Sequence, residues 1–141
     1  MMTRALAILI VVAGLVSVAP AQSSLVTTAT VLRTTATLTT SDVLSTTTLP
    51  ARAKAVWFYV DFDKGAATSG AFTPVGAIDA NPAATGYYKL LGYAKTLTAS
   101  DQYVIRVPRE DFGAYQYYGI ASIGVGTLTS TGARVWVKYE Y

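Results

Sequence analysis

Two of the side chains most used in protein chemistry are missing from this sequence. The chain has no histidine and no cysteine, which removes the commonest general base, the commonest metal ligand and every thiol nucleophile. Serine and threonine are plentiful, but a hydroxyl nucleophile needs a base beside it, and neither a Gly-x-Ser-x-Gly nor a Ser-x-x-Lys pattern is present. We therefore predict that the protein is not an enzyme and has no catalytic residue.

Carboxylates are the remaining groups that could transfer protons or bind cations. Asp61 and Asp63 lie two residues apart, so a continuing strand would place both on one face. A glycosidase needs a facing pair, and a calcium loop begins with this kind of spacing, but residues 61–65 lack the later ligands and the closing glutamate. The Asp79–Thr85 stretch is better explained by turn capping. We predict no metal site and no bound cofactor.

The unusual feature of the composition is its ten tyrosines, accompanied by two tryptophans. Adjacent residues of a strand point to opposite faces, so Tyr117 and Tyr118 cannot both enter one core. Ordinary sandwich packing would bury some of these rings and keep their hydroxyls at water. Because aromatic side chains also carry much of the energy of protein interfaces, we predict an interaction surface. Its candidate residues are Trp57, Tyr59, Tyr87, Tyr88, Tyr115, Tyr117, Tyr118, Trp136, Tyr139 and Tyr141.

The charged residues are few and scattered. They make up 13% of the chain, and the net charge is +3. A nucleic-acid binder usually concentrates its basic residues in a stripe, so we expect no direct contact with nucleic acid. A surface with so few charged residues is more typical of a protein in permanent contact with others than of a free, highly soluble monomer.

Residues 1–22 form a segment with a composition of its own. Arg4 is followed by the uncharged apolar run Ala5–Val18 and by the small residues of Ala19–Ala21, which is the order of a secretory signal. The apolar run is shorter than the about 20 residues that a membrane-spanning helix needs. Two interpretations stay open: a leader that is cleaved, or an apolar arm that packs within an assembly. We expect no membrane contact unless the segment is retained and inserted.

Residues 23–141 have the pattern of a single all-β domain. The clearest strand is Ala53–Phe62, and two later strands, Tyr103–Val107 and Arg134–Tyr141, alternate between two faces. Further strands are expected at Leu25–Leu32, Thr34–Thr39, Val43–Thr48, Phe72–Ile78, Tyr87–Tyr93 and Tyr115–Val125. No helical period of convincing length appears. About eight short strands with regular turns predict an antiparallel β-sandwich with a jelly-roll-like arrangement.

Turn-forming residues separate these strands. We expect loops at Asp63–Gly65 and Thr68–Gly70, a turn at Thr96–Asp101 and a polar loop that begins at Arg109. Thr129–Gly132 has the composition of a hairpin turn. The glycines inside the strand that follows Tyr115 indicate a bulge or the close approach of another backbone.

The order of these features resembles a known group of proteins. It runs from Thr-rich strands through the apolar strand AVWFYVDF, the turn from Asp79 to Tyr88 and the Leu90–Gly92 step to the alternating strands Tyr103–Val107 and Val135–Tyr139. Over roughly residues 25–141 it is similar to the small β-sandwich decoration, or cement, proteins of tailed bacteriophage capsids. The resemblance implies a virion structural protein on the capsid exterior, which bridges subunits of the major capsid protein and contacts copies of itself.

A second interpretation is an exported bacterial β-sandwich, either an adhesin or a filament subunit, which reaches the cell surface after its leader is cleaved. Such a protein would use the same aromatic surface and its strand edges to polymerise or to bind glycans. Retention of residues 1–21 in the purified protein would favour the virion protein, and their loss would favour export.

Overall fold

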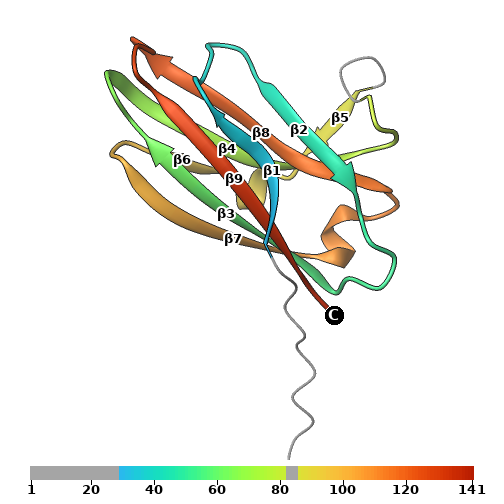
Figure 1. Cartoon of the computed structure of the whole chain (residues 1–141). Helices are drawn as coiled ribbons and strands as arrows, with labels where there is room; N and C mark the ends of the chain where they lie inside the picture. Colours follow the sequence, from blue (N-terminus) through green and yellow to red (C-terminus); the bar gives the residue numbers. More distant parts are fainter. Residues whose placement is uncertain (1–28, 82–85) are drawn as a thin grey trace, which may run out of the picture.

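The strands of this protein build two antiparallel sheets that pack face to face. The computed structural model describes residues 29–81 and 86–141, and Figure 1 shows its two layers. In these ranges one sheet has the order β1-β9-β3-β7 and the five-stranded sheet has the order β2-β8-β4-β5, with β6 also paired to β4. The elements are β1 Thr30–Ala36, β2 Val43–Thr48, β3 Ala55–Asp63, β4 Ala67–Ala77, β5 Tyr87–Lys89, the 3₁₀ helix η1 Leu91–Tyr93, β6 Lys95–Leu97, β7 Asp101–Pro108, the 3₁₀ helix η2 Arg109–Phe112, β8 Tyr117–Gly126 and β9 Gly132–Glu140.

The strand order is that of a jelly roll. Among the described strands, only the β4–β5 and β5–β6 connections stay within one sheet, and every other connection crosses to the opposite sheet. β5 and β6 pair with successive parts of β4, at Val75–Ala77 and at Gly70–Phe72, so they share one strand position. Two layers of four strand positions each, in this order, confirm the predicted jelly-roll-like β-sandwich.

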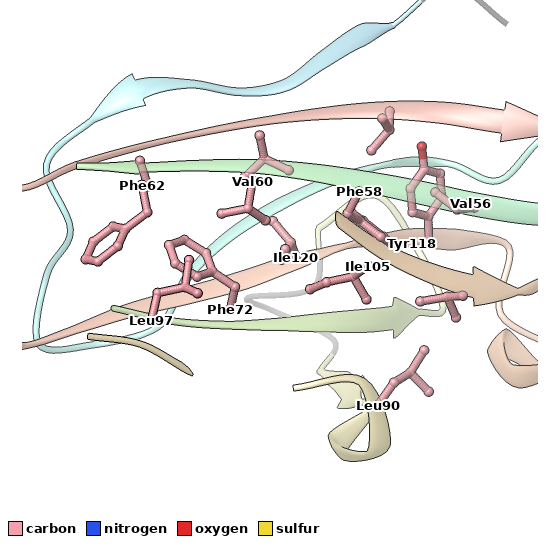
Figure 2. Packing of buried hydrophobic residues seen from close by; sticks show 14 of the residues in the cluster. Val56, Phe58, Val60, Phe62, Phe72, Leu90, Leu97, Ile105, Tyr118 and Ile120 are labelled. Atoms are coloured by element: carbon pink, nitrogen blue, oxygen red, sulfur yellow. The ribbon is translucent and has the colours of Figure 1, made fainter. Parts of the chain in front are cut away.

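The core lies between the sheets and results from alternation along the long strands. In β3, Phe58, Val60 and Phe62 are buried while the residues between them face outward. Figure 2 shows these side chains meeting Phe72 and Tyr118 of the opposite sheet. Fully burying a side chain of this kind contributes about 1.5–3 kcal/mol. The same alternation therefore determines which β3 residues reach the outer face.

β1 is a single strand where two were expected. The predicted strands Leu25–Leu32 and Thr34–Thr39 are wrong within the described residues, because β1 runs through the gap between them. Its pairing register with β9 shifts on both sides of Arg33. These bulges let the Arg33 side chain turn inward without ending the strand. Residues 25–28 lie outside the described residues.

β4 runs through a stretch that was expected to be a loop. Thr68–Gly70 lies inside β4, so that prediction is wrong. A Cβ atom at Gly70 would come within 2.7 Å of the Phe62 ring, so close packing and not a turn requires this glycine. The expected loop at Asp63–Gly65 does turn the chain, with Gly65 at a φ of 50°.

The expected strand Tyr87–Tyr93 is interrupted. β5 ends at Lys89 and η1 follows. The Leu90 N–H donates to the Pro74 carbonyl at 2.9 Å, but Pro74 has no N–H to donate in return, so the ladder along this edge of β4 breaks there. Pairing resumes with β6, at the start of the expected turn Thr96–Asp101.

The connection at Thr129–Gly132 turns the chain but closes no hairpin. β8 and β9 lie in different sheets, because both edges of β8 are already paired, one with β2 and the other with β4. β9 pairs instead with β1 and β3. The turn carries the chain from one layer to the other, and the hairpin prediction is wrong. The polar loop expected at Arg109 is the short helix η2.

Candidate interaction surface

The outer face of the four-stranded sheet carries a row of apolar side chains that crosses all of its strands. The register pairs Val31 with Trp136, Trp136 with Tyr59, and Tyr59 with Val104. Neighbouring residues in β3, β7 and β9 point into the core, so alternation directs this row outward. Trp57 lies beside the row, two residues before Tyr59 on the same face of β3. We call Val31, Trp57, Tyr59, Val104 and Trp136 the aromatic face.

An open cleft of about 550 Å³ lies on the aromatic face. Its apolar lining includes Tyr59, Val104 and Trp136. Its polar lining consists of Asp61, Gln102 and Lys138. The Gln102 side-chain amide donates to the Asp61 carboxylate at 3.4 Å. This combination of a broad apolar surface with a few polar groups is typical of binding sites in proteins.

Cationic side chains lie over the aromatic rings of this face. The Arg134 guanidinium is 4.5 Å from the centre of the Trp136 ring, and the Lys138 ammonium is 5.2 Å from that of Tyr59. Each such contact contributes about 0.5–1 kcal/mol at an exposed site. The cations therefore cover ring faces that would otherwise be open to solvent, and they present positive charge to any partner.

Glu140 fixes the Trp57 side of the aromatic face. Its carboxylate accepts two hydrogen bonds from the Arg106 guanidinium, at 2.9 and 3.1 Å, and one from the Trp57 indole N–H at 3.1 Å. These bonds, that of Arg106 above all, lower the pKa of Glu140. The carboxylate stays ionised at neutral pH and acts as an anchor for two side chains, not as a proton donor.

A second group of apolar side chains is exposed beside η1 and the β4–β5 connection. Ile78, Tyr88 and Leu91 are 68%, 58% and 71% exposed. The Tyr88 and Tyr115 rings stack with centroids 6.2 Å apart. The Tyr93 hydroxyl donates to Asp111 and closes one side of the group. We call Ile78, Tyr88, Leu91, Tyr93 and Tyr115 the end patch.

The ten aromatic residues singled out in the sequence fall in different parts of the molecule. Trp57, Tyr59 and Trp136 come together on the aromatic face, and Tyr88 and Tyr115 come together in the end patch. Tyr87, on β5, donates its hydroxyl proton to Asp42 at 2.9 Å. Tyr117 is half-buried.

Tyr118 lies in the core and not on a surface. It is fully buried, and its hydroxyl donates to the Tyr139 hydroxyl at 2.7 Å. Tyr139 is half-buried against the core, and Tyr141 packs on it with ring centroids 6.4 Å apart. We therefore place Tyr118 outside the candidate surface, as strand alternation allows for one member of the Tyr117–Tyr118 pair.

Several residues of the aromatic face were not among the sequence candidates. Val31, Val104, Arg134 and Lys138 join it through the pairing of strands that are far apart in the chain. For β7 and β9 the strict alternation in the sequence was a signal that could have identified them. Val31 carried no such signal, because the bulges at Arg33 break the alternation of β1.

Asp63, the second carboxylate of the Asp61–Asp63 pair, caps a turn. Asp63 is exposed and accepts hydrogen bonds from the Gly65 N–H and the Ser100 hydroxyl, which is a turn-capping arrangement. Within residues 29–81 and 86–141, no three acidic side chains are grouped so that they could hold a metal ion. In the same residues no helix is long and apolar enough to cross a membrane.

The fold and this surface define a jelly-roll sandwich with an outward aromatic face. Comparisons of the chain with protein-family models, with curated proteins and with solved structures gave no significant match.

Proposed function

We propose that this protein is a non-catalytic structural subunit, which binds neighbouring protein subunits through the aromatic face. Its setting is the exterior of a bacteriophage capsid, where it acts as a decoration subunit that bridges subunits of the major capsid protein. The observation that carries the proposal is the apolar row from Val31 to Val104, which crosses a whole sheet on the side away from the core.

The exposure of this row is costly for a protein that stays alone. Val31 and Val104, at its two ends, are 41% and 44% exposed. Contiguous apolar surface of this kind marks interaction sites on soluble proteins. Covering it contributes about 25 cal/mol per Å² of apolar area, and tryptophan, tyrosine and arginine are the residues that most often dominate such contacts.

The cations on the rings favour a protein partner over a sugar. A sugar ring binds aromatic residues by stacking on the ring face, but Arg134 and Lys138 lie over the faces of Trp136 and Tyr59. A protein partner can place carboxylates on these cations and apolar side chains beside the rings, so it can use both parts of the surface.

The jelly roll agrees with the proposed setting. This architecture is common in viral capsid domains and also in lectins. A decoration subunit that binds the assembled shell but not its free parts stabilises the shell by mass action. This role needs no catalytic group.

Shell binding by surface variants tests the proposal. Tyr59→Ser with Trp136→Ser removes the centre of the aromatic face without touching the core, and Val125→Ser is a matched control, because Val125 is 50% exposed on the other sheet. We expect the unaltered chain and the control to co-sediment with shells of the major capsid protein. We expect the double variant to bind at least about tenfold more weakly, in line with the loss of two hot-spot residues. Equal binding of all three proteins, or no binding of the unaltered chain, would contradict the proposal.

The signal-like order of residues 1–21 favours a second candidate function, an exported adhesin or filament subunit. The intact mass of the protein from its natural source separates the two. Retention of these residues supports the decoration subunit, and their loss supports export.

A further inference from the structure

We infer that two copies of this chain pair along the open edge of β7, antiparallel about a twofold axis at Val104, so that their four-stranded sheets join into one continuous sheet. Adding a strand to an exposed sheet edge is a common way for β proteins to associate. Three observations support the inference: a regular open edge, polar groups that complement each other across the axis, and an apolar residue at the centre.

β7 has one edge without a partner among the described strands. It is the last strand of the order β1-β9-β3-β7, and Figure 1 shows it at the border of its layer. Its pairing with β3 has no register shift, whereas β1, at the opposite border, is bulged. In the other sheet, β2 has six residues and β5 and β6 have three each, against eight in β7. β7 therefore offers the longest regular edge of the described sandwich.

Every second residue of β7 directs its backbone groups toward the open edge. The Arg109 N–H donates to the Lys54 carbonyl at 2.8 Å, one step beyond the last ladder pair, Ala55–Pro108. Because bonded and non-bonded pairs alternate in an antiparallel ladder, the odd-numbered residues of β7 bond to β3. The even-numbered residues therefore face the open edge. Pro108 is one of them, so its missing N–H removes no bond within the sheet.

The edge-facing residues Gln102, Val104 and Arg106 pair with themselves in one register. An antiparallel copy centred on Val104 sets the two Val104 residues opposite each other and Gln102 opposite Arg106 of the second copy. The Val104 amides then bond to each other's carbonyls, and each Arg106 N–H bonds to the Gln102 carbonyl of the second copy. The Gln102 N–H keeps its bond to the Asp101 carboxylate at 2.8 Å. Other registers set one of the three against Pro108 or against the turn before β7.

The outward side chains at the two ends of the edge complement each other. The Gln102 amide donates to Asp61 at 3.4 Å, which leaves its side-chain oxygen as an acceptor. Arg106 uses Nε and Nη2 to bind Glu140, and Nη1 makes neither of these bonds. In the pair, Nη1 of each Arg106 lies within reach of Gln102 of the second copy and on the side of the Asp61 carboxylate. Antiparallel pairing thus places a cation beside an acidic end on both sides of the axis.

Val104 provides the apolar centre of the contact. It is 44% exposed, and in the pair it is covered by Val104 of the second copy. An open groove of about 260 Å³ lies between β7 and residues 92–95. It offers space for the side chains of the second copy that point toward the core layer.

The pair has a consequence for the aromatic face, which rests on the proposed function. A twofold axis perpendicular to the sheet keeps both outer faces on the same side. The apolar row of one copy therefore continues into that of the other, because Val104 is the end of each row. Two faces that bind one shell together raise the apparent affinity above that of a single face.

Cysteine cross-linking tests the register, because the natural chain has no cysteine. Directly opposed residues of such a pair have Cα atoms about 5.5 Å apart, which a disulfide can bridge. Val104→Cys should give a disulfide-linked dimer under mild oxidation, and a mixture of Gln102→Cys and Arg106→Cys chains should link unlike chains. Val125→Cys, exposed on the other sheet, is the matched control and should stay monomeric. Equal linking of Val104→Cys and Val125→Cys, or links between like chains only in the mixture, overturns the inference.

Sedimentation equilibrium of the purified chain tests the backbone pairing. Val104→Pro removes an N–H that faces the open edge, so it takes no bond from β3, and it should raise the dimer dissociation constant at least about tenfold. Thr46→Pro is the matched control, because the bond from Leu49 to Gln116 places Thr46 in the same way on the open edge of β2. An unaltered chain that stays monomeric up to about 0.1 mM overturns the inference. Equal effects of the two prolines do so as well.

The edge contact and the aromatic face can fail separately, because pairing is measured without shells. The Tyr59→Ser, Trp136→Ser variant should dimerise like the unaltered chain, since its β7 edge is intact. Loss of the dimer in this variant would assign the self-contact to the aromatic face and overturn the inference. If the chain dimerises through β7 but the variant binds shells normally, the edge contact stands and the proposed function is wrong. If the chain stays monomeric and only the variant loses shell binding, the proposed function stands and the edge contact is wrong.

Discussion

Tyr118 holds together one end of the core. Its ring makes edge contacts with Phe58, Phe112 and Tyr139, with centroids 5.7, 5.7 and 6.0 Å away. Burial, together with the hydrogen bond to Tyr139, raises the pKa of Tyr118 far above that of a free tyrosine. The hydroxyl therefore stays protonated and donates to Tyr139 wherever the fold exists.

Two substitutions at this residue separate the ring from the hydroxyl. Tyr118→Phe removes the hydroxyl hydrogen bond, and we expect a loss of about 1 kcal/mol in the free energy of unfolding. Tyr118→Ala also leaves a cavity, and we expect a loss of about 3–5 kcal/mol. Urea unfolding measures both. Losses of the same small size would contradict the placement of Tyr118 in the core.

A charged cluster links β5 to the start of β2. Asp42 pairs with the Lys89 ammonium at 2.5 Å and accepts the Tyr87 hydroxyl proton at 2.9 Å. Burial, the largest single effect, raises the pKa of Asp42, but the hydrogen bonds from Lys89 and Tyr87 together lower it below 3.8. The hydrogen bond to Asp42 raises the pKa values of Lys89 and Tyr87 above 10.5 and 10.0.

These directions define a pH window for the cluster. The contribution of Asp42 to stability is present above its unfolded pKa and is lost as the pH falls through its lowered folded pKa. The contributions of Lys89 and Tyr87 are present below their unfolded pKa values and are lost as the pH rises through the raised ones. The cluster therefore stabilises the fold between mildly acidic and mildly alkaline pH.

Asp42→Asn tests this window. We expect it to lower the free energy of unfolding by at most about 1 kcal/mol at neutral pH, because the partners are partly exposed. The difference from the unaltered protein should shrink below about pH 4, as Asp42 itself becomes protonated. Denaturant unfolding at several pH values measures it, and a difference that grows toward acid would contradict the lowered pKa of Asp42.

At the scale of elements, β1 depends on one buried cation. Arg33 is 5% exposed. Its guanidinium reaches the Ser122 hydroxyl of the opposite sheet at 2.8 Å, and it also donates to the carbonyls of Ala36, Thr37 and Ala133 at 3.3–3.4 Å. Burial lowers the pKa of Arg33, but an arginine stays charged at any pH that proteins tolerate. The bulged edge strand is thus attached to both layers through a single side chain.

Arg33→Ala removes the hydrogen bonds that join β1 to Ser122 of the opposite sheet and to the carbonyls of Ala36, Thr37 and Ala133, and we expect a loss of about 2–4 kcal/mol in the free energy of unfolding. Arg33→Lys keeps the charge but loses the planar arrangement of donors, so it should lose a large part of that amount. Urea unfolding and hydrogen exchange of the β1 amides measure the effects. A lysine variant as stable as the unaltered protein would show that the hydrogen bonds from the Arg33 guanidinium do not contribute to stability.

At the scale of the whole molecule, local sequence patterns predicted where the strands lie better than which strands pair with each other. The alternation of Val135 and Val137 with Trp136 is a property of a few adjacent residues, and β9 follows it. The assignment of β8 and β9 to different sheets depends on which edges other strands have already paired. The break at Pro74 likewise depends on what lies across β4. Both outcomes depend on which strands compete for the same edge, and a short stretch of sequence does not record that competition.

The candidate surface also combines a part that depends on local sequence with a part that depends on strand pairing. Strand alternation places Trp57 and Tyr59 on one face of β3. That Trp136 lies opposite Tyr59, and Val104 on its other side, results from strand register across most of the chain. The sequence could therefore predict which residues are available for a surface but not which of them become neighbours.

Native mass spectrometry of the protein taken from its natural source tests the central claim most directly. If the protein works by binding neighbouring subunits, it will be found in assemblies far heavier than a single chain of these 141 residues, which has a mass of 14.9 kDa. The Tyr59→Ser, Trp136→Ser variant will be missing from them. A protein that occurs in its natural setting as a free monomer, with the aromatic face bound to no other protein, would contradict the account.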